Sequence, residues 1–446
     1  MPQVKLTQQQ VMIIGVAAIV ILGIGGLLFF NGQKKSSTAQ AVVLKVWGTD
    51  DAKVFDNLVA YYAQYNPSAK ITYTQVAPAD YENELLHAFA EGTGPDVFEI
   101  GNRALPRWQS ILAPLPPAYY TQFGPLQLEN DFPSVVQNDF MASSTATSTS
   151  ADIYALPLSV DTLTMLYNKS LFDSAGIVAP PATWDDFEAD VLKLRTLNAG
   201  GQIAQAGAAI GGSETSIPEA PDILSLLMLQ NGTQMVNDDL SAAKFAGDPS
   251  SAGGSAFNFY LQFANAASPY YTWSDTMGDD VQDFINGKTA IIFGYHDTLA
   301  DIQAKAPFMD VGVAAVPQPT GATVAISYPK YNGLAVYKDS ASVISAWQFI
   351  LSLTTYANGE KIYTDATGDP PALRSAIATA ESDPILSVFA KQELTARSWY
   401  EVDDQQVDSI LNSAIQNTLN GSATALQALE QAQSSISSLM FQRQHQ

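Results

Sequence analysis

The sequence predicts an α/β fold in which β-rich runs alternate with amphipathic helices. The first β-rich run is VVLKVW (residues 42–47), and similar runs follow at 70–76 and 96–100. Between them, apolar residues recur every three or four positions, for example Val54, Phe55 and Leu58. A strand–helix–strand–helix–strand order is typical of a doubly wound parallel sheet, which is the expected core of the chain.

Later segments continue the same alternation. Thr183 with Asp186 forms a capping box that begins a helix lined by Phe187. A helix followed by a strand is expected over 280–293, strands over 311–316 and 333–337, and helices over 343–351, 407–415 and 426–439. Trp184 and Trp347 lie on the apolar stripes of their helices, so both are expected in the core.

The N-terminal segment predicts a membrane anchor. Residues 11–30 (VMIIGVAAIVILGIGGLLFF) contain no charge and are long enough to cross a bilayer as one helix. The apolar core of a signal peptide is usually shorter, about 7–15 residues. Residues 1–41 are therefore expected to form an uncleaved transmembrane helix and a short polar tether. The alternative is secretion after cleavage near Ala41, at the sequence Ala39-Gln40-Ala41.

Composition narrows the functional classes. The chain has 446 residues, 47% of them hydrophobic, which is enough for two or three folded domains. Its net charge of −23 argues against nucleic acid or an anionic lipid surface as a partner. It has no cysteine and three histidines, so thiolate chemistry is excluded, and neither a cofactor nor a metal site is expected.

Sequence motifs for catalysis are missing. The chain contains no GxSxG, HExxH, P-loop or strand-linked GxGxxG. Its acidic pairs, such as Asp185-Asp186 and Asp279-Asp280, are explained by helix starts and solvated turns. A glycosidase would need two carboxylates facing one cleft, and nothing in the pattern favours that arrangement. The chain is therefore predicted to be a binding protein and not an enzyme.

Aromatic residues in polar surroundings are candidates for ligand contact. Trp47 ends the first strand, and ligands of α/β proteins gather at the carboxyl ends of strands. Trp273 lies in SPYYTWSD and Trp399 in RSWYEVDD. An exposed aromatic ring can stack on the apolar face of a sugar while carboxylates and amides bind its hydroxyls. His296, in FGYHD, is either a ligand contact or an ordinary polar residue.

One block carries a family resemblance: LPLSVDTLTMLYNKSLFDSAGIVAPPATWDDF (156–187). It is similar to the pattern of the extracellular solute-binding proteins of ABC importers, family 1, which include maltose-binding protein. Weaker support comes from GTGPDVFEI, FINGKTAIIFGY, VGVAAVPQP and GDPPALRSA. The resemblance covers about residues 44–440 in order. Thr164 stands where a small residue is commoner.

The resemblance implies two α/β lobes of the periplasmic-binding-protein fold (class II type) that close on a solute. It places lobe 1 at residues 42–160 plus 310–357 and lobe 2 at 161–309 plus 358–446. The chain would cross between the lobes near 159–161, 308–312 and 356–360. Such a protein works by closing around its ligand, so no catalytic group is needed.

The resemblance also implies ligand-binding positions. Asp161, an acid before an apolar run, matches the acid that sugar binders carry there, although a solvated strand end would also explain it. Further matching positions are Asp50, Asn102, Arg103 and Trp399. Tyr295 and His296 stand where many members have a tryptophan, which puts the identity of the sugar in doubt. Trp273 has no counterpart in the family pattern.

The function implied is the substrate-binding component of an ABC importer, which binds a sugar or oligosaccharide and delivers it to a permease. A monomer is expected, with its body outside the cytoplasmic membrane. A second hypothesis keeps the fold and changes the solute to a polyamine, a phosphate ester or another polar compound. A carbohydrate-active enzyme and a solute sensor are two further hypotheses, from different functional classes.

Overall fold

The computed structural model describes residues 42–143 and 150–445. Among these residues, none of the helices is both long and apolar enough to cross a membrane. The predicted anchor at 11–30 and the cleavage position near Ala41 lie outside the described residues. From Val43 onward the chain forms one compact unit, which is built around two main sheets.

The larger sheet defines lobe 1 and has five strands in the order β2-β1-β3-β14-β6. Strand β1 runs parallel to both β2 and β3, whereas β14 runs antiparallel to β3 and β6. The sheet is therefore mixed, whereas the sequence predicted a parallel sheet. The strands are β1 (Val43–Gly48), β2 (Lys70–Gln75), β3 (Val97–Gly101), β6 (Ala155–Pro157) and β14 (Asn332–Val336).

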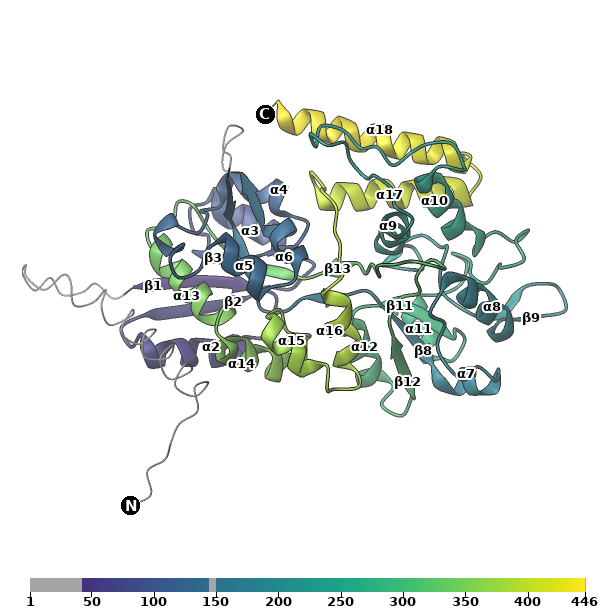
Figure 1. Cartoon of the computed structure of the whole chain (residues 1–446), viewed down its shortest axis with the longest axis horizontal. Helices are drawn as coiled ribbons and strands as arrows, with labels where there is room; N and C mark the ends of the chain where they lie inside the picture. Colours follow the sequence, from purple (N-terminus) through teal and green to yellow (C-terminus); the bar gives the residue numbers. More distant parts are fainter. Residues whose placement is uncertain (1–41, 144–149, 446) are drawn as a thin grey trace, which may run out of the picture. The chain divides into compact units, whose positions relative to one another are not determined.

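Helices cover the larger sheet because their apolar faces point inward. In α2 the buried residues Val54, Phe55, Leu58 and Tyr62 recur at helical spacing, and Asp51 caps the first turn. Helix α14 packs on α2 (Figure 1), and α13 packs on α2, β6 and β14. The helices of this lobe are α2 (Ala52–Tyr65), α3 (Tyr81–Ala90), α4 (Leu105–Trp108), α5 (Pro125–Asp131), α6 (Ser134–Phe140), α13 (Val343–Thr354), α14 (Ala357–Thr367) and α15 (Arg374–Ala380).

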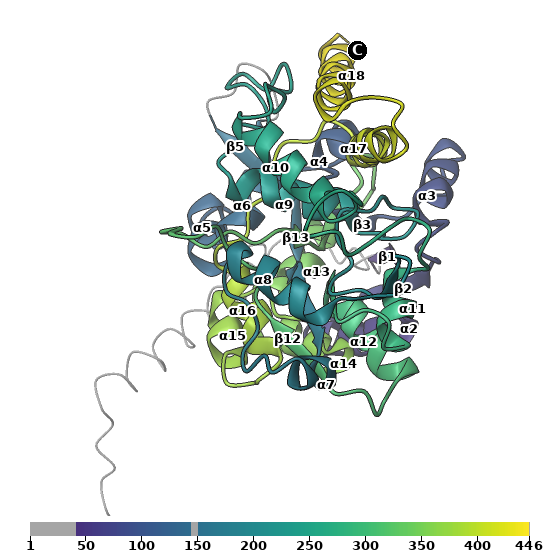
Figure 2. The same cartoon turned by 90° about the vertical axis from the view of Figure 1, so that its right-hand side faces the viewer.

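The smaller sheet defines lobe 2 and has three antiparallel strands in the order β11-β8-β12. These are β8 (Thr164–Asn168), β11 (Ile291–Gly294) and β12 (Val311–Ala314). One apolar core joins this sheet to helices α8–α12, α17 and α18. Figure 2 shows α17 and α18 side by side. The helices are α7 (Lys169–Ser174), α8 (Trp184–Leu194), α9 (Ala220–Gln230), α10 (Ala252–Gln262), α11 (Asp280–Ile285), α12 (His296–Lys305), α17 (Asp404–Leu419) and α18 (Ala425–Gln444).

The two lobes are connected through a short ladder. Strand β7 (Asp161–Thr162) pairs antiparallel with β13 (Pro329–Lys330), and these two strands lie between the strands of the two sheets along the chain. Helix α16 (Leu386–Glu393) packs on β7. Its Gln392 side chain donates hydrogen bonds to Thr162 Oγ1 and the Leu163 carbonyl, which ties the helix to the connecting segment.

The crossing predicted near 159–161 falls between β6 of the larger sheet and β8 of the smaller sheet. The predicted boundary at 310 places β12 in lobe 1, whereas β12 pairs with β8 of the smaller sheet; the chain leaves lobe 2 only at β13. The boundary at 358 places α14 in lobe 2, whereas α14 packs on α2 of lobe 1. Strand pairing and helix packing are long-range contacts, which local sequence pattern does not reveal.

Two smaller pairs of strands complete the described strands. Strand β4 (Met141–Ser143) pairs with β5 (Ala151–Ile153), and β9 (Thr196–Leu197) pairs with β10 (Ile203–Gln205). The predicted core tryptophans Trp184 and Trp347 are both buried, as expected from their helical stripes.

Candidate functional site

A polar cavity of about 260 Å³ lies where the connecting ladder meets the two lobes. Its lining comes from segments far apart in the sequence. Acids, tyrosines and one lysine dominate it, with few apolar side chains. The lining residues are Asp50, Glu99, Leu158, Ser159, Asp161, Tyr295, Asp297, Lys330, Tyr331, Asn332, Leu334, Tyr363 and Asp369.

Sheet topology brings these segments to one edge. Strands β1 and β3 are parallel, so the residues after β1 lie at the same edge as the end of β3. Strand β14 runs the other way, so its first residue, Asn332, pairs with Gly101 at this edge. Strand β6 is antiparallel to β14, and its end leads into β7. The cavity thus occupies the strand-end position at which α/β proteins bind ligands.

Asp161 is held in place by two backbone groups. Its Oδ1 accepts a hydrogen bond from the Thr162 amide at 2.7 Å, and its Oδ2 accepts one from the His296 amide at 2.7 Å. His296 is the first residue of α12, so the carboxylate satisfies a free amide at a helix N-terminus. Burial, and next the repulsion from Asp297, raises the pKa of Asp161 well above its usual range. The acid is thus oriented, lines the cavity and has no cationic partner among the described residues.

Glu99 is a single acid in an otherwise apolar strand. Only 6% of the residue is exposed, and its Oε2 accepts hydrogen bonds from the Thr49 amide and hydroxyl at 3.0 and 3.1 Å. A Cβ at position 48 would lie 2.4 Å from Glu99 Oε1, so the close approach of this carboxyl requires Gly48. Burial, and next the repulsion from Asp50, raises the pKa of Glu99 to about 8. Burial likewise raises the pKa of Asp50 to about 6.

Histidine and tyrosine side chains contact Asp369 and Lys330. His296 Nδ1 lies 3.1 Å from Asp369 Oδ1, and the Tyr363 hydroxyl donates to Asp369 Oδ2 at 3.3 Å. The Lys330 ammonium lies 4.9 Å from the centre of the Tyr295 ring. These contacts link the lining residues of lobe 1, lobe 2 and the ladder.

Three of the nine predicted ligand residues line the cavity: Asp50, Asp161 and Tyr295. His296 lies behind them and bonds to Asp161 and Asp369. Trp47 is only partly buried and does not line the cavity, and its carbonyl accepts a hydrogen bond from the Tyr81 hydroxyl.

The two predicted stacking tryptophans are core residues of lobe 2. Trp273 is fully buried, and its indole N–H donates to Ser216 Oγ at 2.9 Å. Trp399 is 8% exposed, with its ring edge against Phe245 and its N–H 3.4 Å from Ser225 Oγ. Their polar neighbours in sequence suggested exposure, but the indole rings fill the interior and each N–H finds a serine.

Asn102 and Arg103 are engaged by the protein itself. The Asn102 amide donates to Asp139 Oδ2 at 3.0 Å, and the residue is buried. Arg103 forms ion pairs with Asp222 at 3.5 Å, Glu401 at 3.0 Å and Asp408 at 2.8 Å. Neither side chain lines the cavity; Asn102 bonds within lobe 1, and the ion pairs of Arg103 join lobe 1 to lobe 2.

Most residues that line the cavity were not predicted from the sequence. Glu99 left a signal, because an acid in the buried strand VFEIG needs an explanation. Asp369 lies in the GDPPALRSA block, which supported the family resemblance without being recognised as part of the site. Tyr363 gave no signal, because it lies on an ordinary helix and reaches the cavity only through the packing of α14 on α2.

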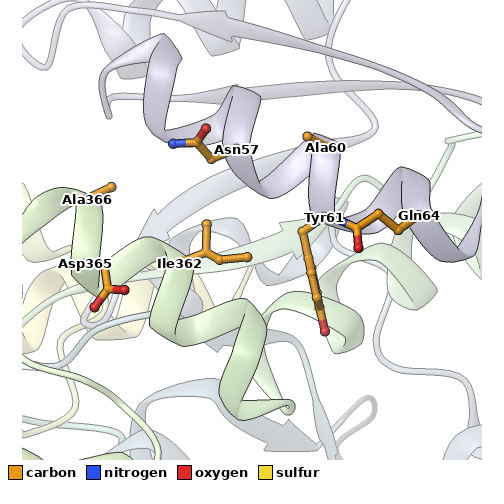
Figure 3. A pocket seen from close by; sticks show the side chains of 7 residues that line it. All are labelled: Asn57, Ala60, Tyr61, Gln64, Ile362, Asp365 and Ala366. Atoms are coloured by element: carbon orange, nitrogen blue, oxygen red, sulfur yellow. The ribbon is translucent and has the colours of Figure 1, made fainter.

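A second hollow lies on the surface of lobe 1, between α2 and α14. Figure 3 shows its lining side chains, which come from these two helices only. It is a wide, open groove lined by Asn57, Ala60, Tyr61, Gln64, Ile362, Asp365 and Ala366. No cluster of charges converges on it, in contrast to the cavity between the lobes.

The fold and the cavity together define a class: a two-lobed α/β binding protein whose lobes meet around a polar cavity. Residues 47–360 match the family of bacterial extracellular solute-binding proteins. Since this match spans most of the chain, the protein belongs to that family, as the resemblance implied. A binding protein of Brucella abortus (strain 2308) is 26% identical over 302 residues, which are 66% of this chain and 67% of that protein.

Solved structures share the fold at low identity. The sugar-binding protein of Xanthomonas citri superposes with a TM-score of 0.74 at 19% identity, over 90% of this chain and 98% of its own. An ABC substrate-binding protein of Listeria monocytogenes in complex with cycloalternan has a TM-score of 0.70 at 22% identity, over 90% of this chain and 99% of its own. A Mycobacterium tuberculosis protein in complex with glycerophosphocholine has a TM-score of 0.72 at 17% identity, over 90% of this chain and 99% of its own.

Proposed function

We propose that this protein is the substrate-binding component of an ABC importer and that it binds a sugar or a related polar solute in the cavity between its lobes. The observation that carries the proposal is the position of the cavity: residues of lobe 1, lobe 2 and the ladder all line it. A solute held there contacts both lobes, so its binding energy favours the closed arrangement. The closed, loaded form is the one delivered to the permease.

The lining suits hydroxyl recognition. Carboxylates such as Asp161 and Asp50 accept hydrogen bonds from sugar hydroxyls, and the Asn332 amide can donate or accept. The tyrosine rings supply apolar surface beside these groups. Relatives with this fold hold cycloalternan in one case and glycerophosphocholine in another, so the fold alone leaves the solute open. Solute binding breaks no bond, so the proposed role is binding without catalysis, in keeping with the family of binding proteins that the chain belongs to.

The test is a thermal-shift screen of the body, residues 42–446, against mono- and oligosaccharides, amines and phosphorylated compounds. A solute present at 100 times its Kd should stabilise the protein by about 2.7 kcal/mol and raise its melting temperature. Incubation with chromogenic glycosides serves as the control for an enzyme and should give no turnover. If no solute raises the melting temperature, or if a glycoside is hydrolysed, the proposal fails.

We also place the body on the extracytoplasmic face of the cell membrane, anchored by residues 11–30. The support is the run of twenty uncharged residues, which matches the thickness of a bilayer. Mass spectrometry of the protein from native membranes should find residues N-terminal to Ala41. A mature protein that starts at Val42 would instead indicate secretion after cleavage.

A further inference from the structure

Acids outnumber bases in the lining of the cavity between the lobes. Five of its lining side chains are carboxylic acids, and one, Lys330, is a base. The acids come from different elements: Asp50 follows β1, Glu99 lies in β3, Asp161 in β7 and Asp297 in α12, and Asp369 follows α14. Five separate segments thus direct acids at one small volume, and a neutral solute does not require this arrangement.

Protein cations do not balance these acids. Among the described residues, Asp50, Glu99, Asp161 and Asp297 form no ion pair, and Asp369 is paired only with His296. The arginine nearest in sequence to β3, Arg103, is bound to three other acids outside the cavity. Lys330 pairs with Glu219 at 3.9 Å, and half of its side chain is exposed. Among the described residues, these acids therefore face the cavity without a lysine or arginine ion-pair partner.

Glu99 provides a second observation that points to a ligand. The residue is 94% buried, yet it lines the cavity, and only its Oε2 receives hydrogen bonds from described residues. Its Oε1 has no donor in the described part of the chain. Oε1 is not fully enclosed by the protein, so it is open to a donor placed in the cavity. An N–H group of a solute in the cavity would be such a donor.

Aromatic rings in the lining of the cavity also favour a bound cation. Tyr295, Tyr331 and Tyr363 line the same cavity, and the Lys330 ammonium already lies over the Tyr295 ring. Faces of aromatic rings attract ammonium groups. Lys330 thus shows that the cavity accommodates a positive charge at this ring, with Glu219 3.9 Å from the same ammonium group.

We infer that the solute bound between the lobes carries a protonated amine, which the carboxylates of Asp50, Glu99, Asp161, Asp297 and Asp369 recognise. The inference rests on the proposed function of the cavity and specifies its substrate class. The volume of about 260 Å³ lies just below the usual range for small-molecule pockets, about 300–1,000 Å³, so the solute is small. An amino sugar and a short polyamine share this chemistry, and the acidic cavity disfavours phosphate esters.

The test compares charged and neutral probes. Isothermal titration calorimetry with glucosamine, glucose and N-acetylglucosamine separates the amine from the sugar ring, and spermidine tests a cation without a ring. We expect at least one of the two amines to bind at least 10-fold more tightly than both neutral sugars. Raising the salt concentration should weaken binding of the amine and leave binding of the neutral sugars nearly unchanged.

A matched pair of variants on α12 tests the role of the cavity charge. Asp297 lines the cavity, whereas Asp301, one turn further along the helix, pairs with Lys305 at the surface. Asp297→Asn should weaken amine binding 3- to 10-fold, and Asp301→Asn should not change it. Lys330→Gln, which removes the single base of the lining, should strengthen amine binding several-fold.

The outcomes separate the two proposals. Neutral sugars that bind as tightly as both amines would overturn the inference and leave the sugar-binding function standing. Equal effects of Asp297→Asn and Asp301→Asn on amine affinity would also overturn it, because the charge would then act from a distance and not in the cavity. A failure of every amine and every sugar to bind would contradict both proposals.

Discussion

Asp161→Asn should weaken solute binding 10- to 100-fold, which corresponds to about 1.5–3 kcal/mol for a hydrogen bond to a charged group. Asp161 lines the cavity, and both of its oxygens are oriented by backbone amides. The substitution keeps the size of the side chain and removes its charge. Titration of the tightest-binding compound of the thermal-shift panel measures the effect, with Asp301→Asn on the surface of α12 as the control.

The same substitution should lower the stability of the empty protein moderately. The NH2 of an asparagine cannot accept the hydrogen bond that one Asp161 oxygen takes from a backbone N–H, whereas loss of the acid relieves repulsion from Asp297 and Asp369. Asp161→Ala removes both acceptors and should lower the melting temperature more than Asp161→Asn does. An Asn variant with unchanged affinity, or one that binds weakly only because it is unfolded, would show that Asp161 is structural.

The elements of the fold were largely predictable because they rest on local pattern. The stripe Val54, Phe55 and Leu58 is buried in α2, and Thr183 caps α8 as its capping box indicates. The position of β12 was not predictable, because a short apolar strand has the same pattern in either sheet. Only its register with β8 assigns it to lobe 2. Lobe boundaries therefore depend on long-range pairing that the sequence pattern does not show.

The candidate site was predictable only where an acid interrupts an apolar run. Asp161 follows this rule, and Glu99 follows it as well although it was not chosen. The tryptophans were expected to be exposed, but polar neighbours in sequence say little about where a large ring points. Trp273 and Trp399 pack inside lobe 2, while the rings that line the cavity are tyrosines. Side-chain direction is set by tertiary packing, which carries most of the information about the site.

Arg103→Met should cost the protein about 3–5 kcal/mol of stability, the usual loss when one partner of a buried ion pair is removed. Arg103 follows β3 of lobe 1, while Asp222 on α9, Glu401, and Asp408 on α17 belong to lobe 2. The Glu401 side chain is fully buried, so it would be left without a counter-charge. Urea unfolding of the body measures the loss. Lys305→Met, which breaks an exposed pair on α12, should cost less than about 1 kcal/mol.

The stability that Arg103→Met loses should increase with pH. Burial raises the pKa of Glu401 well above its usual range, and Arg103 opposes this shift. Without Arg103, the pKa of Glu401 in the folded protein should rise further above its value in the unfolded chain. The folded state then binds a proton that the unfolded chain releases as the pH rises, so the folded state loses stability with increasing pH. Arg103→Met should therefore lose more stability at pH 8 than at pH 5, and Glu401→Gln in the same chain should reduce that difference.

Because the ion pairs of Arg103 join both lobes, the Arg103→Met variant should also be more open in small-angle scattering. A stable, compact Arg103→Met protein would show that the lobes are held together by other contacts.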